Sequence, residues 1–72
     1  MKLHYYPETD ALYIELNETP GADSQEIADG VVLNTDLDGR PVGIDIDVAS
    51  ERIDLRTLEL MALPTTSTRL AG

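Results

Sequence analysis

The stretch that decides the fold is NTDLDGRPVGID, residues 34–45. Asn34, Asp36 and Asp38 alternate at its start and Asp45 closes it, which is close to the spacing of a calcium-binding loop. The same residues also suit an acidic β-hairpin turn. The two interpretations predict different folds, because a calcium loop of this type joins two helices and a hairpin turn joins two strands.

The flanks of this stretch favour the hairpin. Residues 31–33 are apolar and mostly β-branched, and apolar residues alternate with small or acidic ones after the stretch. Asp45 belongs to this alternation, so the strand sets its direction. In the hairpin, Asp36 accepts a backbone hydrogen bond at the start of the turn, and Gly39 takes the left-handed conformation. The alternation after the stretch is carried by Val42, Ile44, Ile46 and Val48.

The details of the stretch also weaken the calcium interpretation. Asp45 is one carbon shorter than the bidentate Glu of such loops, and Pro41 has no N–H to donate. We therefore expect no metal; Asp36, Asp38 and Asp45 are the candidates if a cation binds. A two- or four-residue loop would place Leu33 opposite Val42, and a three-residue loop would place it opposite the glycine at 43. We expect the first, because it pairs apolar residues.

The N-terminal residues predict a second hairpin. Leu3 and Tyr5 alternate with polar residues, and so do Leu12 and Ile14. A four-residue connection, residues 7–10, sets Tyr5 opposite Leu12 and Leu3 opposite Ile14, which makes one face wholly apolar. The same register sets Lys2 opposite Glu15, His4 opposite Tyr13 and Tyr6 opposite Ala11. Asp10 is expected to be a turn residue that caps Ala11 or nearby N–H groups.

The predicted fold is α+β: a small antiparallel meander of four strands, or five if residues 25–28 form a strand, with a short C-terminal helical element. Asp29-Gly30 is a hairpin dipeptide or a bulge. Residues 49–53 suit one helical turn, with Ser50 or Asp54 as cap. Residues 54–63 fit a helix and a strand equally well. The helix and residues 58–63 should cover the apolar face, namely Leu3, Tyr5, Leu12, Ile14, Val42, Ile44 and Ile46. We expect one domain, residues 1–63, and a frayed polar tail, residues 64–72.

Size and charge restrict the function. The chain has 72 residues, no Cys, and 14 acidic against 5 basic side chains, a net charge of −9. Such a charge opposes binding to nucleic acid and to anionic membranes. A chain this short has a marginal core, and association of two copies buries further apolar surface, so we expect a homodimer. No apolar run suits a signal or a membrane span, which predicts the cytoplasm.

No set of residues predicts catalysis or a cofactor. The one histidine, His4, lies opposite Tyr13 and has no nucleophile motif beside it, so it is expected to be structural or solvent-facing. The three tyrosines are expected to fill the core and its rim. Asp45 and Asp47 are expected to form a solvated strand face, and Arg52 with Arg56 a small basic spot facing these acids across a dimer. We expect the protein not to be an enzyme.

Several blocks of the chain resemble a bacterial family, domain of unknown function 2283. They are Tyr6 to Ile14, Asp29 to Leu33, Asp36 to Arg40, Val42 to Ile46 and Ala49-Ser50. The likeness runs from about Met1 to Leu63. Asp10, Tyr13, Gly39 and Gly43 are the turn and structural positions within these blocks. The family often has Asp after its tyrosine, where this chain has Pro7. The resemblance implies a small antiparallel sheet with a short helix, no established catalytic activity, and a loose association with small toxin-like proteins.

Two functions follow as expectations. The first is an acidic protein-interaction module, homodimeric and antitoxin-like, whose partner is a small basic toxin-like protein. The second is a module that binds a cation or small ligand through the Asp-rich hairpin, residues 34–47. The first relies on the charge and the resemblance, and the second on the spacing of the aspartates.

Overall fold

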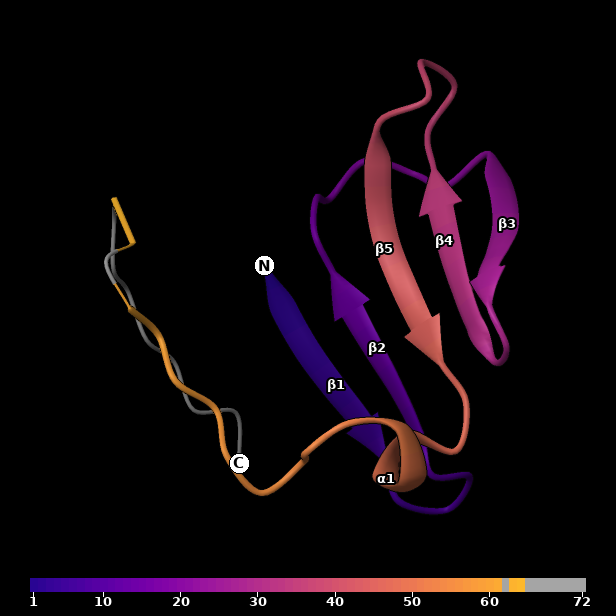
Figure 1. Cartoon of the computed structure of the whole chain (residues 1–72). Helices are drawn as coiled ribbons and strands as arrows, with labels where there is room; N and C mark the ends of the chain where they lie inside the picture. The colour runs from indigo at the N-terminus through magenta and orange to yellow at the C-terminus, as the bar shows by residue number, and fades with distance from the viewer. Residues whose placement is uncertain (62, 65–72) are drawn as a thin grey trace.

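The computed structural model describes residues 1–61, 63 and 64 of the chain. These residues form five strands and one short helix (Figure 1). The tail expected at residues 64–72 lies outside the described residues apart from Pro64. The elements are β1 (Lys2–Tyr6), β2 (Ala11–Glu15), β3 (Asp23–Ala28), β4 (Val31–Thr35), β5 (Pro41–Ile46) and α1 (Ala49–Arg52).

The five strands form one antiparallel sheet in the order β1-β2-β5-β4-β3. The antiparallel sheet and the short helix are confirmed, and the fifth strand is present. The predicted meander is wrong in one connection. After β2 the chain crosses to β3 at the far edge of the sheet, and then returns through β4 to β5, which lies beside β2. This order pairs Leu12 with Ile46 and Ile14 with Ile44, so the apolar residues of both hairpins lie on one face.

The register of the N-terminal hairpin is confirmed at all five pairs, including Tyr5 with Leu12 and His4 with Tyr13. Two local signals determine it. The alternation permits only registers that keep the apolar residues on one face, and the turn is closed by the Thr9 N–H, which donates to Tyr6 O at 3.3 Å. Both signals lie within the hairpin itself, which is why sequence reasoning was sufficient here.

The predicted registers of the β4–β5 hairpin are wrong. Leu33 pairs with Ile44 and Val31 with Ile46, two residues further along than the favoured register. The reason is a loop longer than the four residues considered, in which the Asp36 N–H donates to Arg40 O, together with a bulge between Asn34 and Thr35. A shift of two residues keeps each side chain on its own face, so the prediction of an apolar and a polar face still holds.

The β3–β4 turn combines the two alternatives for Asp29-Gly30. The dipeptide connects the strands, with Gly30 at φ 72°, and a bulge lies between Glu26 and Ala28. Because β3 is an edge strand, the bulge interrupts the regular row of its backbone groups, a feature that discourages unwanted strand pairing.

The core is small and lies at one end of the apolar face. Leu12, Ile46 and Ala49 form a buried cluster there, and Ile14, Val31 and Ile44 pack against it and stay half-buried. Val42 is also buried, but it lies at the start of β5 and outside this cluster. The predicted cover is only partial, because Leu3 and Tyr5 remain 47% and 40% exposed.

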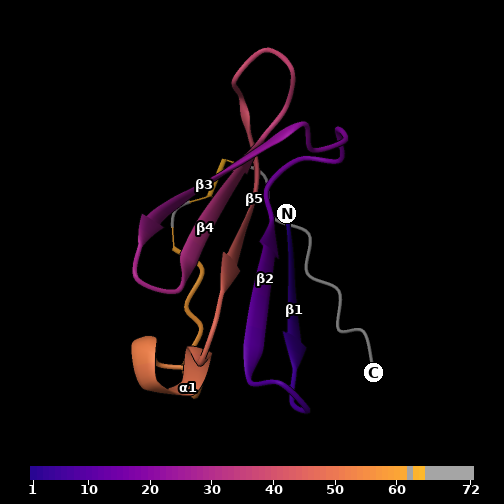
Figure 2. The same cartoon turned by 90° about the vertical axis from the view of Figure 1, so that its right-hand side faces the viewer.

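The helix α1 lies in front of the sheet near the β1–β2 turn (Figure 1), and Figure 2 shows it displaced to one side of the strands. Beyond α1 the chain forms neither of the two structures that residues 54–63 allowed: a turn at residues 55–56 is followed by irregular backbone through residue 61. The described residues include no helix with the length and apolar composition needed to cross a bilayer.

Candidate functional site

Asp10 joins the β1–β2 turn to the start of α1. Its backbone O accepts the Ala49 N–H at 2.8 Å, and Oδ1 accepts the Ser50 N–H at 3.1 Å. The Ser50 hydroxyl donates to Oδ2 at 2.6 Å, and the Tyr5 hydroxyl donates to Oδ1 at 2.8 Å. Asp10 itself has φ 53°, a left-handed conformation that aspartate tolerates. Its carboxylate thus satisfies the helix end from 40 residues away in the chain.

This network shifts two pKa values in opposite directions. The hydrogen bonds from Ser50 and then from Tyr5 stabilise the carboxylate and lower the pKa of Asp10. The Tyr5 hydroxyl donates to that carboxylate, so its pKa is raised, chiefly by the hydrogen bond and further by burial and the negative charge. Both pKa shifts favour the ionised carboxylate and the neutral phenol.

Sequence reasoning misplaced the caps of this helix. Neither Ser50 nor Asp54 caps it from within; the residue at the cap position is Val48, in the left-handed conformation at φ 48° and without a side-chain bond. Asp10 was expected to cap Ala11 or its neighbours and instead caps α1. The Asp54 carboxylate accepts the Arg56 N–H at 3.0 Å, beyond the helix end.

Arg52 anchors the other end of α1 to the β3–β4 turn. Its Nε donates to Asp47 O at 2.6 Å, and its guanidinium lies 3.8 Å from the Asp29 carboxylate. The guanidinium also lies over Gly30, where an added Cβ would come within 2.7 Å of it. Arg52 thus bonds within its own chain, and does not form a basic spot with Arg56, which pairs with Asp54 at 3.7 Å. A four-residue helix therefore ties two hairpin turns together.

Tyr13 and Gly43 form a second constellation, on the polar face of the sheet. The Tyr13 ring lies across Gly43 on the neighbouring strand, so that an added Cβ would fall 2.6 Å from the ring carbon Cζ. A glycine inside a strand is explained by such a close approach. Sequence reasoning named both residues as structural positions, and the structure brings them together.

A row of polar side chains crosses three strands on the same face. The Ser24 hydroxyl donates to Asn34 Oδ1 at 2.7 Å, and Asn34 Nδ2 donates to Asp45 Oδ2 at 2.7 Å. Tyr13 pairs with Asp45 in the next strand. Asp45 thus lies in a hydrogen-bonded row, whereas Asp47 lies just beyond the end of β5.

The cation candidates are not assembled into one group. Asp36 Oδ1 accepts the N–H groups of Asp38 and Arg40, each at 2.9 Å, and the Gly39 N–H donates to Asp36 O at 3.1 Å. Gly39 has φ 80°, so the predicted turn chemistry is confirmed. Asp45 bonds to Asn34 instead. Within the described part of the chain, no three His, Cys, Asp or Glu side chains converge to hold a metal ion.

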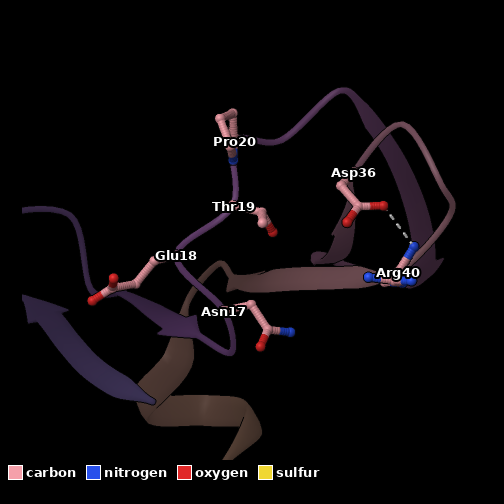
Figure 3. A pocket seen from close by; sticks show the side chains of 6 residues that line it. All are labelled: Asn17, Glu18, Thr19, Pro20, Asp36 and Arg40. Carbon is pink, nitrogen blue, oxygen red and sulfur yellow. Dashed lines mark hydrogen bonds between the residues drawn. The ribbon is translucent and has the colours of Figure 1, made fainter.

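A hollow of about 470 Å³ lies between the β4–β5 loop and the segment after β2 (Figure 3). In Figure 3 the Glu18 side chain points away from Asp36 and Arg40. The Asp36 carboxylate accepts a hydrogen bond from the Arg40 N–H. The Asn17 amide donates to Pro41 O at 2.8 Å, which holds the two loops together. The lining residues are Asn17, Glu18, Thr19, Pro20, Asp36 and Arg40.

The tyrosines were expected to fill the core and its rim, and among them only Tyr5 lies on the apolar face, at its exposed rim. His4 stacks on Tyr6 on the polar face, with ring centroids 4.2 Å apart and planes at 16°. Tyr5 and Tyr6 are exposed and Tyr13 is half-buried. The histidine thus lies on the face opposite Tyr5, and no hydrogen bond to a hydroxyl nucleophile is formed by its ring among the described residues.

Two residues of these networks were missed as site residues, Ser50 and Arg52. Both lie in the four-residue helix, and both act on turns that are distant in the sequence. No local sequence pattern indicated that Ser50 would bond to Asp10 or that Arg52 would pair with Asp29. These contacts depend on the strand order that brings both turns to one end of the sheet.

Comparison with known proteins gives one family match. No curated protein and no solved structure matches the chain. A model of the family described as protein of unknown function, DUF2283, matches residues 2–50, from the start of β1 to Ser50 beside the Asp10 carboxylate. The match spans most of the chain and ends at the residue that Asp10 holds, and the chain belongs to this DUF2283 family.

Proposed function

We propose that this protein is a small acidic interaction module that works as a homodimer. The observation that carries the proposal is the apolar face of the sheet, which α1 covers only at one end. Leu3 and Tyr5 remain exposed, and Ile14, Leu33 and Ile44 are only half-buried. A contiguous apolar surface of this kind is typical of a protein interface.

The charge pattern supports dimerisation through this face. Within β1, β2, β5 and β4 the residues on this face are uncharged, whereas Glu15 and Asp45 lie on the polar face. Two chains that each carry −9 can therefore meet on the apolar side with their strand carboxylates directed outward.

The polar face then suits a basic partner. Its acidic residues, together with those of the loops, give a field that attracts a small basic protein and speeds association. This supports the antitoxin-like role, in which the dimer neutralises a small basic toxin-like protein. Raising the salt concentration should weaken that complex, because exposed charges are screened.

Sedimentation velocity of a matched pair of variants tests the dimer. Leu33 and Val32 are neighbours on β4 and lie on opposite faces. We expect the native chain and Val32→Asp to sediment as dimers, and Leu33→Asp as a monomer, with far-UV circular dichroism confirming the fold of each. A native chain that remains monomeric at high micromolar concentration would overturn the proposal.

A tagged pull-down from the native cell tests the partner. We expect one small basic protein at near-equal amount at low salt and its loss at high salt. Glu26→Lys, on the polar side of β3, is the control bait and should retain less of it. A bait that elutes alone as a dimer leaves self-association as the function and removes the antitoxin-like role.

A further inference from the structure

The C-terminal arm, meaning residues 53–61 with 63 and 64, has an unusual combination of apolar side chains and irregular backbone. Leu58 is 69% exposed and Met61 75% exposed. In the described part of the chain, the only hydrogen bonds of the arm backbone are those of the Ile53 and Arg56 N–H groups, both local. Its apolar residues are Ile53, Leu55, Leu58, Leu60, Met61 and Leu63, and each is at least 36% exposed.

The start of the arm lies along the apolar face of its own sheet but does not close over it. A groove of about 680 Å³ remains between the two, lined mainly by apolar side chains. Leu3, Tyr5 and Ile14 form its sheet side, and Leu55 and Leu58 belong to its arm side. The arm and the sheet face are therefore both apolar surfaces, and neither buries the other.

We propose that the arm is a dimerisation arm, which packs on the exposed part of the apolar face of a second copy while the second copy's arm does the same in return. This rests on the proposed homodimer and names the segment that builds it. The exchange is isologous, because each copy donates one arm and receives one.

Reach and charge both fit a second copy. An extended chain from Ile53 to Leu63 spans at most about 35 Å, whereas two packed sheets lie only about 10 Å apart. The arm carries Asp54, Arg56 and Glu59, and Asp54 is paired with Arg56, so the arm adds little negative charge to the contact. An uncharged face and a nearly neutral arm are the parts of this acidic chain that another copy can approach without repulsion.

A single substitution in the full chain tests the arm. Leu58→Asp places a charge in the proposed contact, and Leu37→Asp places the same charge on a side chain that is 94% exposed at the tip of the β4–β5 loop. We expect Leu58→Asp to raise the dimer dissociation constant by about 100-fold and Leu37→Asp to leave it unchanged. The thermal melt of each variant reports whether the fold is intact.

Cysteine pairing tests the exchange itself, because the chain contains no Cys. A Leu58→Cys chain is mixed with a Leu3→Cys chain of different mass and oxidised, because Leu3 lies on the exposed part of the apolar face. We expect a disulfide between the two masses, and none when Leu37→Cys replaces Leu58→Cys.

The outcomes separate the two proposals. A monomeric native chain overturns both the homodimer and the arm. A dimer that survives Leu58→Asp, or one that forms no mixed disulfide, overturns the arm and leaves the homodimer standing. Both proposals are supported if Leu58→Asp dissociates the dimer and the two cysteine variants form the mixed disulfide.

Discussion

Two turn aspartates of this sheet show how one residue type can act at short or long range. Asp36 accepts the N–H groups of residues two and four positions later, so all its bonds lie within its own loop. Asp10 bonds to Ser50, which is 40 positions away, and to Tyr5. The first aspartate shapes a hairpin, and the second connects a hairpin to the helix. Removing Asp36 should therefore disturb one loop, whereas removing Asp10 should loosen the end of the whole sheet.

The difference between the two aspartates is tested most directly by comparing the thermal stability of Asp10→Ala with that of Asp36→Ala. Asp10→Ala removes the acceptor of three hydrogen bonds and leaves alanine in a left-handed conformation, so we expect the melting temperature to fall by about 10 °C or more. Asp36→Ala should lower it by about half as much. Thermal melts followed by circular dichroism measure both, and equal losses would contradict the long-range role of Asp10.

A second prediction concerns the contact that joins the two hairpins. Gly43→Ala places a methyl group against the Tyr13 ring, and we expect a destabilisation of about 1–3 kcal/mol. In Tyr13→Ala the same glycine substitution should be nearly neutral, because the ring is gone. Urea denaturation of the four proteins gives the coupling free energy, and additive effects would show that the ring does not lie over Gly43.

The strained start of α1 gives a third prediction. Val48 is a β-branched residue at φ 48°, a conformation that asparagine tolerates better. We expect Val48→Asn to stabilise the fold by about 1 kcal/mol, measured by urea denaturation. Val48→Thr keeps the branched carbon and should change little. A gain for threonine equal to that for asparagine would show that relief of backbone strain is not the cause.

The smallest effect is a change in the pH dependence of stability. The pKa of Asp10 is lowered in the folded state, so its contribution is complete above its ordinary value of 3.8 and is lost as the pH falls through the folded value. The pKa of Tyr5 is raised, so its contribution is complete below its ordinary value of 10.0 and is lost as the pH rises through the folded value.

Asp10→Asn should therefore flatten the stability curve below pH 4 relative to the native chain, whereas Asp36→Asn serves as the turn-aspartate control. Urea midpoints between pH 2 and pH 6 measure the difference. A curve for Asp10→Asn as steep as that of the native chain would mean that Asp10 keeps no charge-stabilising bonds in solution.

The sequence by itself determined four of the strands, the register of the first hairpin, the turn chemistry of Asp36 and Gly39, and the separation of an apolar from a polar face, and it left β3 open. Each depends on alternation or on turn residues within a few positions. Only the tertiary structure decided that β5 lies beside β2, that the β4–β5 register shifts at a bulge, and that Asp10 and Arg52 hold α1 at both ends. The physical reason is that strand order and long-range caps depend on which surfaces meet after folding. An alternating pattern shows which residues share a face, but it does not specify which strand lies beside it.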